Sequence, residues 1–285
     1  MSSFENHKSS QECSIIIPVY KRYDIVRSIL LSFSNQTHVE YIKEIIICDS
    51  EKEDRTMRNV IDRCKPLFKD NIIKHIFVEN NIATKRNAGI NEACAENIFF
   101  LDDDCVPTHD YIINHIKMLE TSPNTIFCGI VEFDEHSKNL SNYIKYKNSR
   151  HGVNLSNFLV QSKYVENIDF TKIVTMNMSC KRKLLIENNL FFDEEFLGYG
   201  MEDNEFGWRV HKCGILIKQC EAKIIHNEIG DFNSFCKKIY HIARDGIPKF
   251  ISKQKIAVWV IPFSKYLEAN YPYHDTLGRI TSWII

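Results

Sequence analysis

The sequence predicts an α/β fold in which a mostly parallel sheet is flanked by helices, with a helical tail at the C-terminus. Short runs rich in Ile, Val and Phe alternate with helical patterns through the first half of the chain, which is the rhythm of βαβ units. These runs lack polar alternation, as expected of strands that are buried on both faces of a sheet. The 285 residues suffice for a large core.

The elements of the first half follow from this rhythm. The predicted strands are Ser14–Val19, Glu44–Asp49, Ile72–Val78 and Asn97–Leu101. The predicted helices are a segment from Ile25 to Phe33 with Asp24 as its cap, a stretch from about Arg55 to Leu67, and Ala83–Ala95.

The second half is less regular. Residues 139–170 are polar and match neither period. A glycine-rich turn at Gly198 opens a helix with acids in its first turn, where the helix dipole favours them. The remaining predicted elements are strands at Thr125–Phe133, Lys172–Cys180, Ile215–Ile217 and Ala222–Ile225, with His226 at the exit of the last, and a helix at Arg182–Glu187.

Composition excludes several classes of protein. With 44% hydrophobic and 26% charged residues the chain is globular, and a net charge of -1 gives no sign of a nucleic-acid partner. Ten cysteines without a CxxC pair indicate reduced thiols and neither a disulfide framework nor a zinc site. The polar N-terminus lacks a signal peptide, and the apolar run Ile256–Phe263 is too short to span a bilayer, so we expect a soluble, cytoplasmic protein.

The tail, residues 231–285, is rich in aromatic and basic side chains. Two readings stay open. The tail forms helices that cover one edge of the sheet with their aromatics inward, or it presents a basic-aromatic surface to an anionic lipid or a lipid-linked substrate at the inner face of the membrane.

The run Asn97-Ile-Phe-Phe-Leu-Asp-Asp-Asp-Cys105 is the most informative segment. Side chains two residues apart on a strand point the same way, so Asp102 and Asp104 are expected to face one crevice and Asp103 to face away. Two aligned carboxylates suit Mg²⁺ or Mn²⁺, which commonly brings a phosphate. A strand that ends in a solvated acidic turn is the alternative.

Polar side chains follow all four of the first predicted strands, where an open parallel sheet collects its ligands. The ordered set resembles the family 2 glycosyltransferases of the GT-A fold. The matching pieces are Ser14-Ile-Ile-Ile-Pro-Val-Tyr20, Ile45-Ile-Ile-Cys-Asp-Ser50, Lys85-Arg-Asn-Ala-Gly89, Asp102-Asp-Asp104, Asn177-Met-Ser179 and Glu202-Asp203.

The resemblance implies an inverting enzyme that takes a sugar from a UDP-sugar. It places a catalytic domain at residues 13–230, with a donor half to about 105 and an acceptor half from 106, followed by an extension at 231–285. Its acceptor would be a saccharide or a lipid-linked saccharide in surface polysaccharide or glycoconjugate synthesis. The implied donor-binding residues are Pro18, Tyr20, Asp49, Arg86, Asn87, Asp102, Asp103 and Asn177.

The resemblance also implies a metal and a base. Asp104, Asp102 and His226 would hold Mn²⁺ or Mg²⁺ against the diphosphate. Asp203 would act as general base on the acceptor hydroxyl, with Glu202 beside it. The flanking Gly198, Gly200 and Trp208 resemble the sugar-binding turn of relatives that transfer galactose or N-acetylgalactosamine; a GlcNAc-type donor belongs to the same expectation.

Ordinary structural roles remain alternatives for single residues. Tyr20 would then be a packed aromatic, Asp49 a turn residue, Arg86 a surface residue, His226 a core histidine, and the pair Glu202–Asp203 a helix start.

One family acid is replaced by Cys48, and the motif Gln-x-x-Arg-Trp of membrane-bound synthases is missing. Two rival functions are a sugar nucleotidyltransferase, which would need a glycine-rich phosphate loop near the first strand, and a non-catalytic nucleotide- or carbohydrate-binding module.

Overall fold

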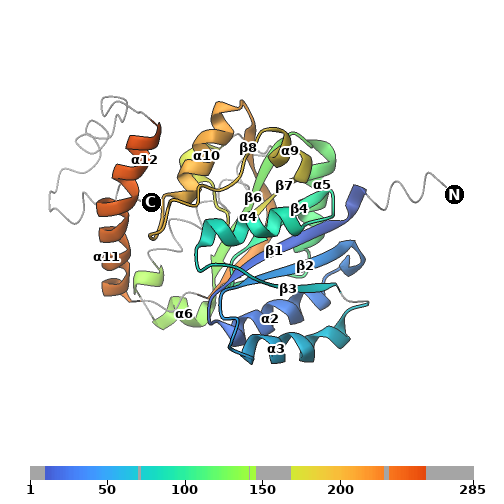
Figure 1. The fold of residues 1–285 in the computed structure, drawn as a ribbon. Helices are drawn as coiled ribbons and strands as arrows, with labels where there is room; N and C mark the ends of the chain where they lie inside the picture. The colour runs from blue at the N-terminus through green and yellow to red at the C-terminus, as the bar shows by residue number, and fades with distance from the viewer. Residues whose placement is uncertain (1–9, 70–71, 141, 146–167, 228–230, 255–285) are drawn as a thin grey trace.

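An eight-stranded sheet lies at the centre of the computed structural model, with helices on both of its faces (Figure 1). The structure describes residues 10–69, 72–140, 142–145, 168–227 and 231–254. The strands are β1 (Cys13–Val19), β2 (Ile42–Asp49), β3 (Ile73–Phe77), β4 (Asn97–Leu101), β5 (Cys105–Pro107), β6 (Thr125–Phe133), β7 (Asn177–Lys181) and β8 (Leu216–His226).

The sheet is parallel in its first half and mixed in its second. Its strand order is β3-β2-β1-β4-β7-β6-β8-β5. The first four strands in this order run parallel. Strand β7 is antiparallel to both of its neighbours, β8 is parallel to β6, and β5 closes the edge antiparallel to β8. The carboxyl ends of β1, β2 and β4 therefore meet at the same edge.

The helices complete the layers. They are α2 (Tyr23–Ser34), α3 (Thr56–Cys64), α4 (Ile82–Glu92), α5 (Tyr111–Thr121), α6 (Glu135–Leu140), α9 (Arg182–Glu187), α10 (Glu202–Lys212), α11 (Phe232–His241) and α12 (Ile247–Gln254). Short 3₁₀ turns are η1 (Val39–Tyr41), η2 (Lys65–Leu67) and η3 (Phe170–Lys172), and the π-helical turn η4 (Ile242–Gly246) joins α11 to α12.

Alternate residues of the strands feed two cores. Ile15 and Ile17 of β1 pack with α2, α3 and α5 on one face, whereas Ile16 packs with α4, α9 and α10 on the other. Both sets are buried, which explains the continuous apolar runs of the sequence.

The predicted α/β architecture is confirmed, with corrections at single elements. Asp24 lies in the first turn of α2, and Arg22 is the residue at its N-cap. The strand expected at Lys172–Cys180 begins only at Asn177, because the 3₁₀ turn η3 takes up residues 170–172 and the N–H of Asn177 then closes a further turn on the carbonyl of Val174 at 3.3 Å.

For other segments the sequence-based prediction was incomplete or made no assignment. The two short strands expected at 215–217 and 222–225 are one continuous strand, β8. Strand β5 and helix α5 had no counterpart in the prediction. Residues 146–167 and 255–285, which include the run Ile256–Phe263 and most of the tail, lie outside the described residues.

The described part of the tail packs beside the second half of the sheet (Figure 1). Phe235 and Ile239 of α11 are buried with Phe133 at the end of β6. The side chain of Gln254 donates to Glu205 of α10 at 2.9 Å. By contrast, Tyr240 is 59% exposed. Aromatic side chains of this segment therefore point both inward and outward.

All ten cysteines are unpaired, and most are buried. Among the described helices, none has both the length and the apolar character that a membrane crossing requires.

Candidate active site

Acidic side chains gather where β1, β2 and β4 end. Asp49 is the last residue of β2 and pairs with Val19 of β1 in the sheet register. The three aspartates 102–104 follow β4 directly. The backbone N–H of Tyr20 donates to Asp103 at 2.8 Å, which ties the segment after β1 to the segment after β4.

Arg22 neutralises two of the three aspartates. Its Nη1 lies 2.6 Å from Asp103 Oδ1 and 2.6 Å from Asp104 Oδ2. The expectation that Asp103 faces away from Asp104 is therefore wrong, since both carboxylates contact the same nitrogen of Arg22, whereas Asp102 is bonded to Arg86. The physical reason is that β4 ends at Leu101, so the alternation of a strand does not continue through the aspartates.

Arg86 of α4 is the centre of a second cluster. It is 2% exposed, and its Nη2 donates to Asp102 Oδ1 at 3.1 Å. Its Nη1 donates to Asp203 Oδ1 at 3.1 Å and lies 3.6 Å from Glu202 Oε1. A buried guanidinium needs such partners, because an unpaired charge in the interior is very costly.

Burial and surplus negative charge shift the acids of this cluster. Burial raises the pKa of Asp102 to about 6, despite the opposing charge of Arg86. Burial also raises the pKa of Glu202, and the charge of Asp203 adds to this shift. The cluster therefore has one cation for three carboxyl groups, and it favours the arrival of a further positive charge.

Asp203 is held in place while its carboxylate stays accessible. The hydroxyl of Thr175 donates to its Oδ1 at 2.7 Å, and its side chain is 29% exposed. It stands in the first turn of α10, after Gly200 and Met201, which both have positive φ angles, of 85° and 76°. A fixed and accessible carboxylate is what a general base requires.

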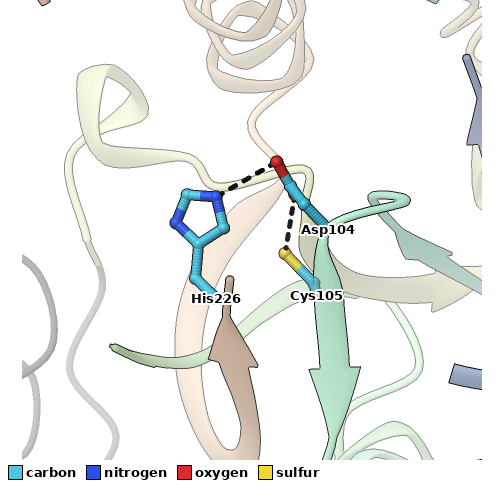
Figure 2. Close-up of side chains that lie close together, drawn as sticks. All are labelled: Asp104, Cys105 and His226. Atoms are coloured by element: carbon cyan, nitrogen blue, oxygen red, sulfur yellow. Dashed lines mark hydrogen bonds and ion pairs between the residues drawn. The ribbon is translucent and has the colours of Figure 1, made fainter. Parts of the chain in front are cut away.

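Asp104, Cys105 and His226 form a group that can hold a metal ion (Figure 2). One ligand atom from each lies within 4.8 Å of the others, and His226 Nε2 is 3.3 Å from Asp104 Oδ2. Although burial raises the pKa of Asp104, the hydrogen bond from His226 and the charge of Arg22 outweigh it and keep the carboxyl group ionised.

Two of the three residues in this group, Asp104 and His226, have side chains that suit a divalent ion. Burial and the neighbouring carboxylates raise the pKa of the Cys105 thiol, so Cys105 is a poor ligand as it stands. A carboxylate and an imidazole suit Mn²⁺ or Mg²⁺. Asp102, predicted as a third ligand, lies in the Arg86 cluster.

A third group of polar side chains surrounds Asp49. His75 Nε2 is 3.1 Å from Asp49 Oδ2, and the carboxyl group is fully buried. Burial would raise the pKa of Asp49, but the hydrogen bond with His75 lowers it below its usual range. Lys85 Nζ donates to the carbonyl of Val19 at 2.7 Å and stands 5.5 Å from the ring of Tyr20, which is 45% exposed.

Three predicted donor-binding residues lie within the sheet or bond to other parts of the protein. Asn177 is fully buried, and its amide donates to the carbonyls of Ile130 and Ala222 at 3.0 Å. Asn87 is bonded to Phe192 in both directions. Pro18 is an interior residue of β1. These contacts hold the second half of the sheet and the segment 192–194 in place.

A pocket of about 360 Å³ opens beside the turn that precedes Glu202. The C-terminal helices form its other wall. Its lining consists of Glu195, Phe196, Leu197, Gly198, Gly200, Asp245, Gly246 and Lys249.

Sequence reasoning missed four residues of these clusters. Arg22, His75 and Thr175 belong to no motif and carry no signal in a single sequence. Lys85 stood within a matched motif, and its nearness to Tyr20 becomes visible only when β1 and α4 are placed side by side.

Comparison with known proteins identifies relatives of this fold. The family model described as Glycosyl transferase family 2 matches residues 14–185. This range contains the three aspartates and Arg86, and it ends before Glu202, Asp203 and His226.

Two curated relatives extend beyond that range. The chain is 26% identical over 269 residues to the uncharacterized glycosyltransferase YfnE of Bacillus subtilis, covering 80% of this chain and 67% of YfnE. It is 22% identical over 240 residues to chondroitin synthase of Escherichia coli, covering 75% of this chain and 34% of that protein. The chain thus spans only about a third of the chondroitin synthase.

A solved structure shares the fold. The crystal structure of S. aureus TarS 1–349 in complex with UDP-GlcNAc aligns with a TM-score of 0.59 at 16% identity, covering 81% of this chain and 65% of that one.

Proposed function

The chain belongs to glycosyl transferase family 2, whose members are glycosyltransferases, and we propose that it is inverting and metal-dependent, with a UDP-sugar as its donor. The observation that carries this proposal is the convergence of Asp49, Asp104, Arg86 and Asp203, from four separate segments of the chain, on one edge of the sheet. The complex of the TarS fragment with UDP-GlcNAc supports the class of donor, because that protein shares the fold.

In our proposal the donor lies across the ends of β1, β2 and β4. Tyr20 stacks on the base, and the buried carboxylate of Asp49 accepts a hydrogen bond from it. Arg86 and Asp102 lie under the diphosphate and ribose. Asp103 contributes by holding the backbone of Tyr20, because it accepts a hydrogen bond from the Tyr20 N–H at 2.8 Å.

Asp104 and His226 would hold Mn²⁺ or Mg²⁺, which supplies Lewis-acid stabilisation of the charge that develops on the leaving diphosphate. The ionised state of Asp104 and its 3.3 Å approach to His226 support this assignment.

Asp203 is our proposed general base. In an inverting transfer the acceptor hydroxyl attacks the anomeric carbon on the face opposite the leaving UDP, and a carboxylate takes the hydroxyl proton. Thr175 and Arg86 each hold the same oxygen of Asp203, Oδ1, and the side chain is 29% exposed, so in this proposal the other oxygen takes the proton. Glu202 would shape the acceptor side of the site.

We further propose a saccharide or a lipid-linked saccharide as acceptor, in surface polysaccharide or glycoconjugate synthesis. The donor sugar would be of the Gal, GalNAc or GlcNAc type. The name chondroitin synthase of one relative and the sugar bound to TarS support these choices. The proposed catalytic domain spans residues 13–230, and the extension 231–285 would bring the enzyme to the inner face of the membrane when the acceptor is lipid-linked.

Calorimetric titration of UDP, compared with GDP, CMP and ADP, tests this proposal. We expect UDP to bind in the presence of Mn²⁺ and the signal to disappear with excess chelator. Asp104→Ala should remove the metal-dependent part of the binding, whereas the matched surface variant Asp62→Ala should bind as the wild type does. Binding of no nucleotide under either condition would refute the proposal and favour a binding module without nucleotide chemistry.

A further inference from the structure

One oxygen atom of the proposed metal site already has a cationic partner. Arg22 Nη1 lies 2.6 Å from Asp104 Oδ2, and this same oxygen is 3.3 Å from His226 Nε2. Arg22 Nη1 also lies 2.6 Å from Asp103 Oδ1. The guanidinium and a divalent ion would therefore compete for one ligand atom, and their like charges repel at such short range.

The two arginines of the site differ in how firmly they are held. Arg86 is 2% exposed and lies among three acids. The Arg22 side chain is 47% exposed and belongs to the short segment between β1 and α2. A half-exposed guanidinium can turn to water or to another anion, and a divalent ion at Asp104 would then offset part of the charge that it leaves on its two carboxylate partners. The buried guanidinium of Arg86 has no comparable exposure. Arg22 is thus the movable cation of the pair.

The backbone next to Arg22 directs the side chain into the site. Lys21 has a φ angle of 56°, in the left-handed region that a residue other than glycine seldom adopts. The preceding N–H, of Tyr20, is fixed by Asp103. Asp103 therefore holds both ends of this short turn, the amide of Tyr20 and the guanidinium of Arg22.

We propose that Arg22 makes uptake of the metal ion dependent on the donor. Without donor, Arg22 neutralises Asp103 and Asp104 and opposes the binding of a cation at Asp104. With donor, its guanidinium turns to the diphosphate and releases Asp104 for the ion. Metal and nucleotide then bind with positive coupling, which by linkage is the same whichever binds first. This inference rests on the proposed function.

A purely structural role makes a different prediction. If Arg22 only held the segment 20–22 in place, its loss would disturb Asp104 and weaken the binding of metal and of nucleotide together. If Arg22 competes with the ion, its loss strengthens the binding of metal alone and weakens the binding of nucleotide. The opposite signs of the two changes separate the roles.

The test uses Arg22→Met, which keeps the length of the side chain and removes its charge. Arg27→Met is the matched control, because it removes the same charge from an exposed position of α2. Binding of Mn²⁺ to the protein alone is measured by the loss of the free-ion EPR signal. UDP binding is measured by calorimetry at saturating Mn²⁺, and near-UV circular dichroism verifies the fold.

We expect Arg22→Met to bind Mn²⁺ alone about tenfold more tightly than the wild type and to bind UDP with Mn²⁺ about tenfold more weakly, while Arg27→Met changes neither by more than about twofold. Unchanged or weaker binding of Mn²⁺ by a folded Arg22→Met protein overturns the inference. If the wild type itself binds no UDP with Mn²⁺, the proposed function fails instead, so the two failures are distinguishable.

Discussion

At the scale of single residues, the site has more carboxyl groups than the two arginines that face them can neutralise. Arg86 faces three carboxyl groups, of which Asp102 and Glu202 have raised pKa values, and Arg22 faces two more. Carboxyl groups resist ionisation when they are buried near one another. A site of this kind gains free energy when a cation enters, which agrees with the proposed dependence on a divalent ion.

A substitution at Asp49 tests where the nucleotide base of the donor binds. Its carboxylate is buried, and its pKa is held below the usual range, so it offers a charged acceptor at neutral pH. Asp49→Asn keeps the shape and loses the charge, and we expect UDP to bind about tenfold more weakly, as for the loss of a charge-assisted hydrogen bond. Calorimetry checks this, with Asp62→Asn as the surface control. If Asp49→Asn bound UDP as tightly as the wild type, the nucleotide base would have to bind elsewhere.

His115 of α5 gives the fold a pH dependence. It is fully buried between Asn177 and Ser179, and burial lowers its pKa to about 4. In the unfolded chain the pKa is about 6.5, so between these values the unfolded state binds more protons and stability falls as the pH falls. From pH 7.5 to 5 the expected contribution to this loss is roughly 2 kcal/mol.

Urea unfolding at the two pH values measures this effect. In His115→Gln the loss should be smaller by that amount, even though the variant is less stable at both pH values. His109→Gln, at an exposed position, should retain the slope of the wild type. A His115→Gln protein with the same pH slope as the wild type would show that this imidazole takes up its proton in the folded state.

At the scale of elements, the turn before α10 is fixed by the C-terminal helices. A Cβ atom on Gly200 would lie 2.7 Å from the Ile242 side chain, and one on Gly246 would lie 2.9 Å from Met201. Lys253 of α12 also forms an ion pair with Asp193 at 2.5 Å. The turn that carries Glu202 and Asp203 is therefore packed directly against η4, and α12 is tied to the segment before it.

Gly246→Ala should disturb the proposed general base, Asp203, and leave the donor site intact. The added methyl group pushes η4 away from Met201 and from the carbonyl of Gly200, at a cost of about 1–3 kcal/mol for overpacking. We expect the transfer rate to fall several-fold while the affinity for UDP stays unchanged. Gly198→Ala is the matched control, because a Cβ there meets nothing within 4 Å. Steady-state kinetics with calorimetry would contradict this if both glycine variants behaved alike.

At the scale of the whole molecule, what could be predicted from sequence followed burial. Strands β1, β2 and β4 lie where continuous apolar runs placed them, because both of their faces are covered. Strand β8 was divided in two, since exposed Glu221 interrupts its pattern although the backbone continues through it. The start of β7 was misplaced because the cap at Asp169 lies outside any hydrophobic period.

The site followed a different rule. Motifs indicated Asp102, Arg86 and Asp203. In the structure the guanidinium of Arg86 donates to each of the two aspartates at 3.1 Å. Contacts that depend on three-dimensional placement had no sequence signal, such as Thr175 with Asp203 at 2.7 Å and Arg22 with Asp104. Asn177 matched a motif, yet its amide serves the sheet, because a motif gives residue types and not the direction of a side chain.

The most direct test of an inverting transfer with Asp203 as its general base is donor turnover with water as acceptor, followed by NMR, for the wild type and Asp203→Asn. With UDP-GlcNAc, UDP-GalNAc and UDP-Gal as α-linked donors, the wild type should release the β-anomer of one sugar first. Asp203→Asn should bind UDP normally and turn over at least about a hundredfold more slowly, because the base is lost. Release of the α-anomer, or turnover by Asp203→Asn at the wild-type rate, would contradict an inverting transfer with Asp203 as its base.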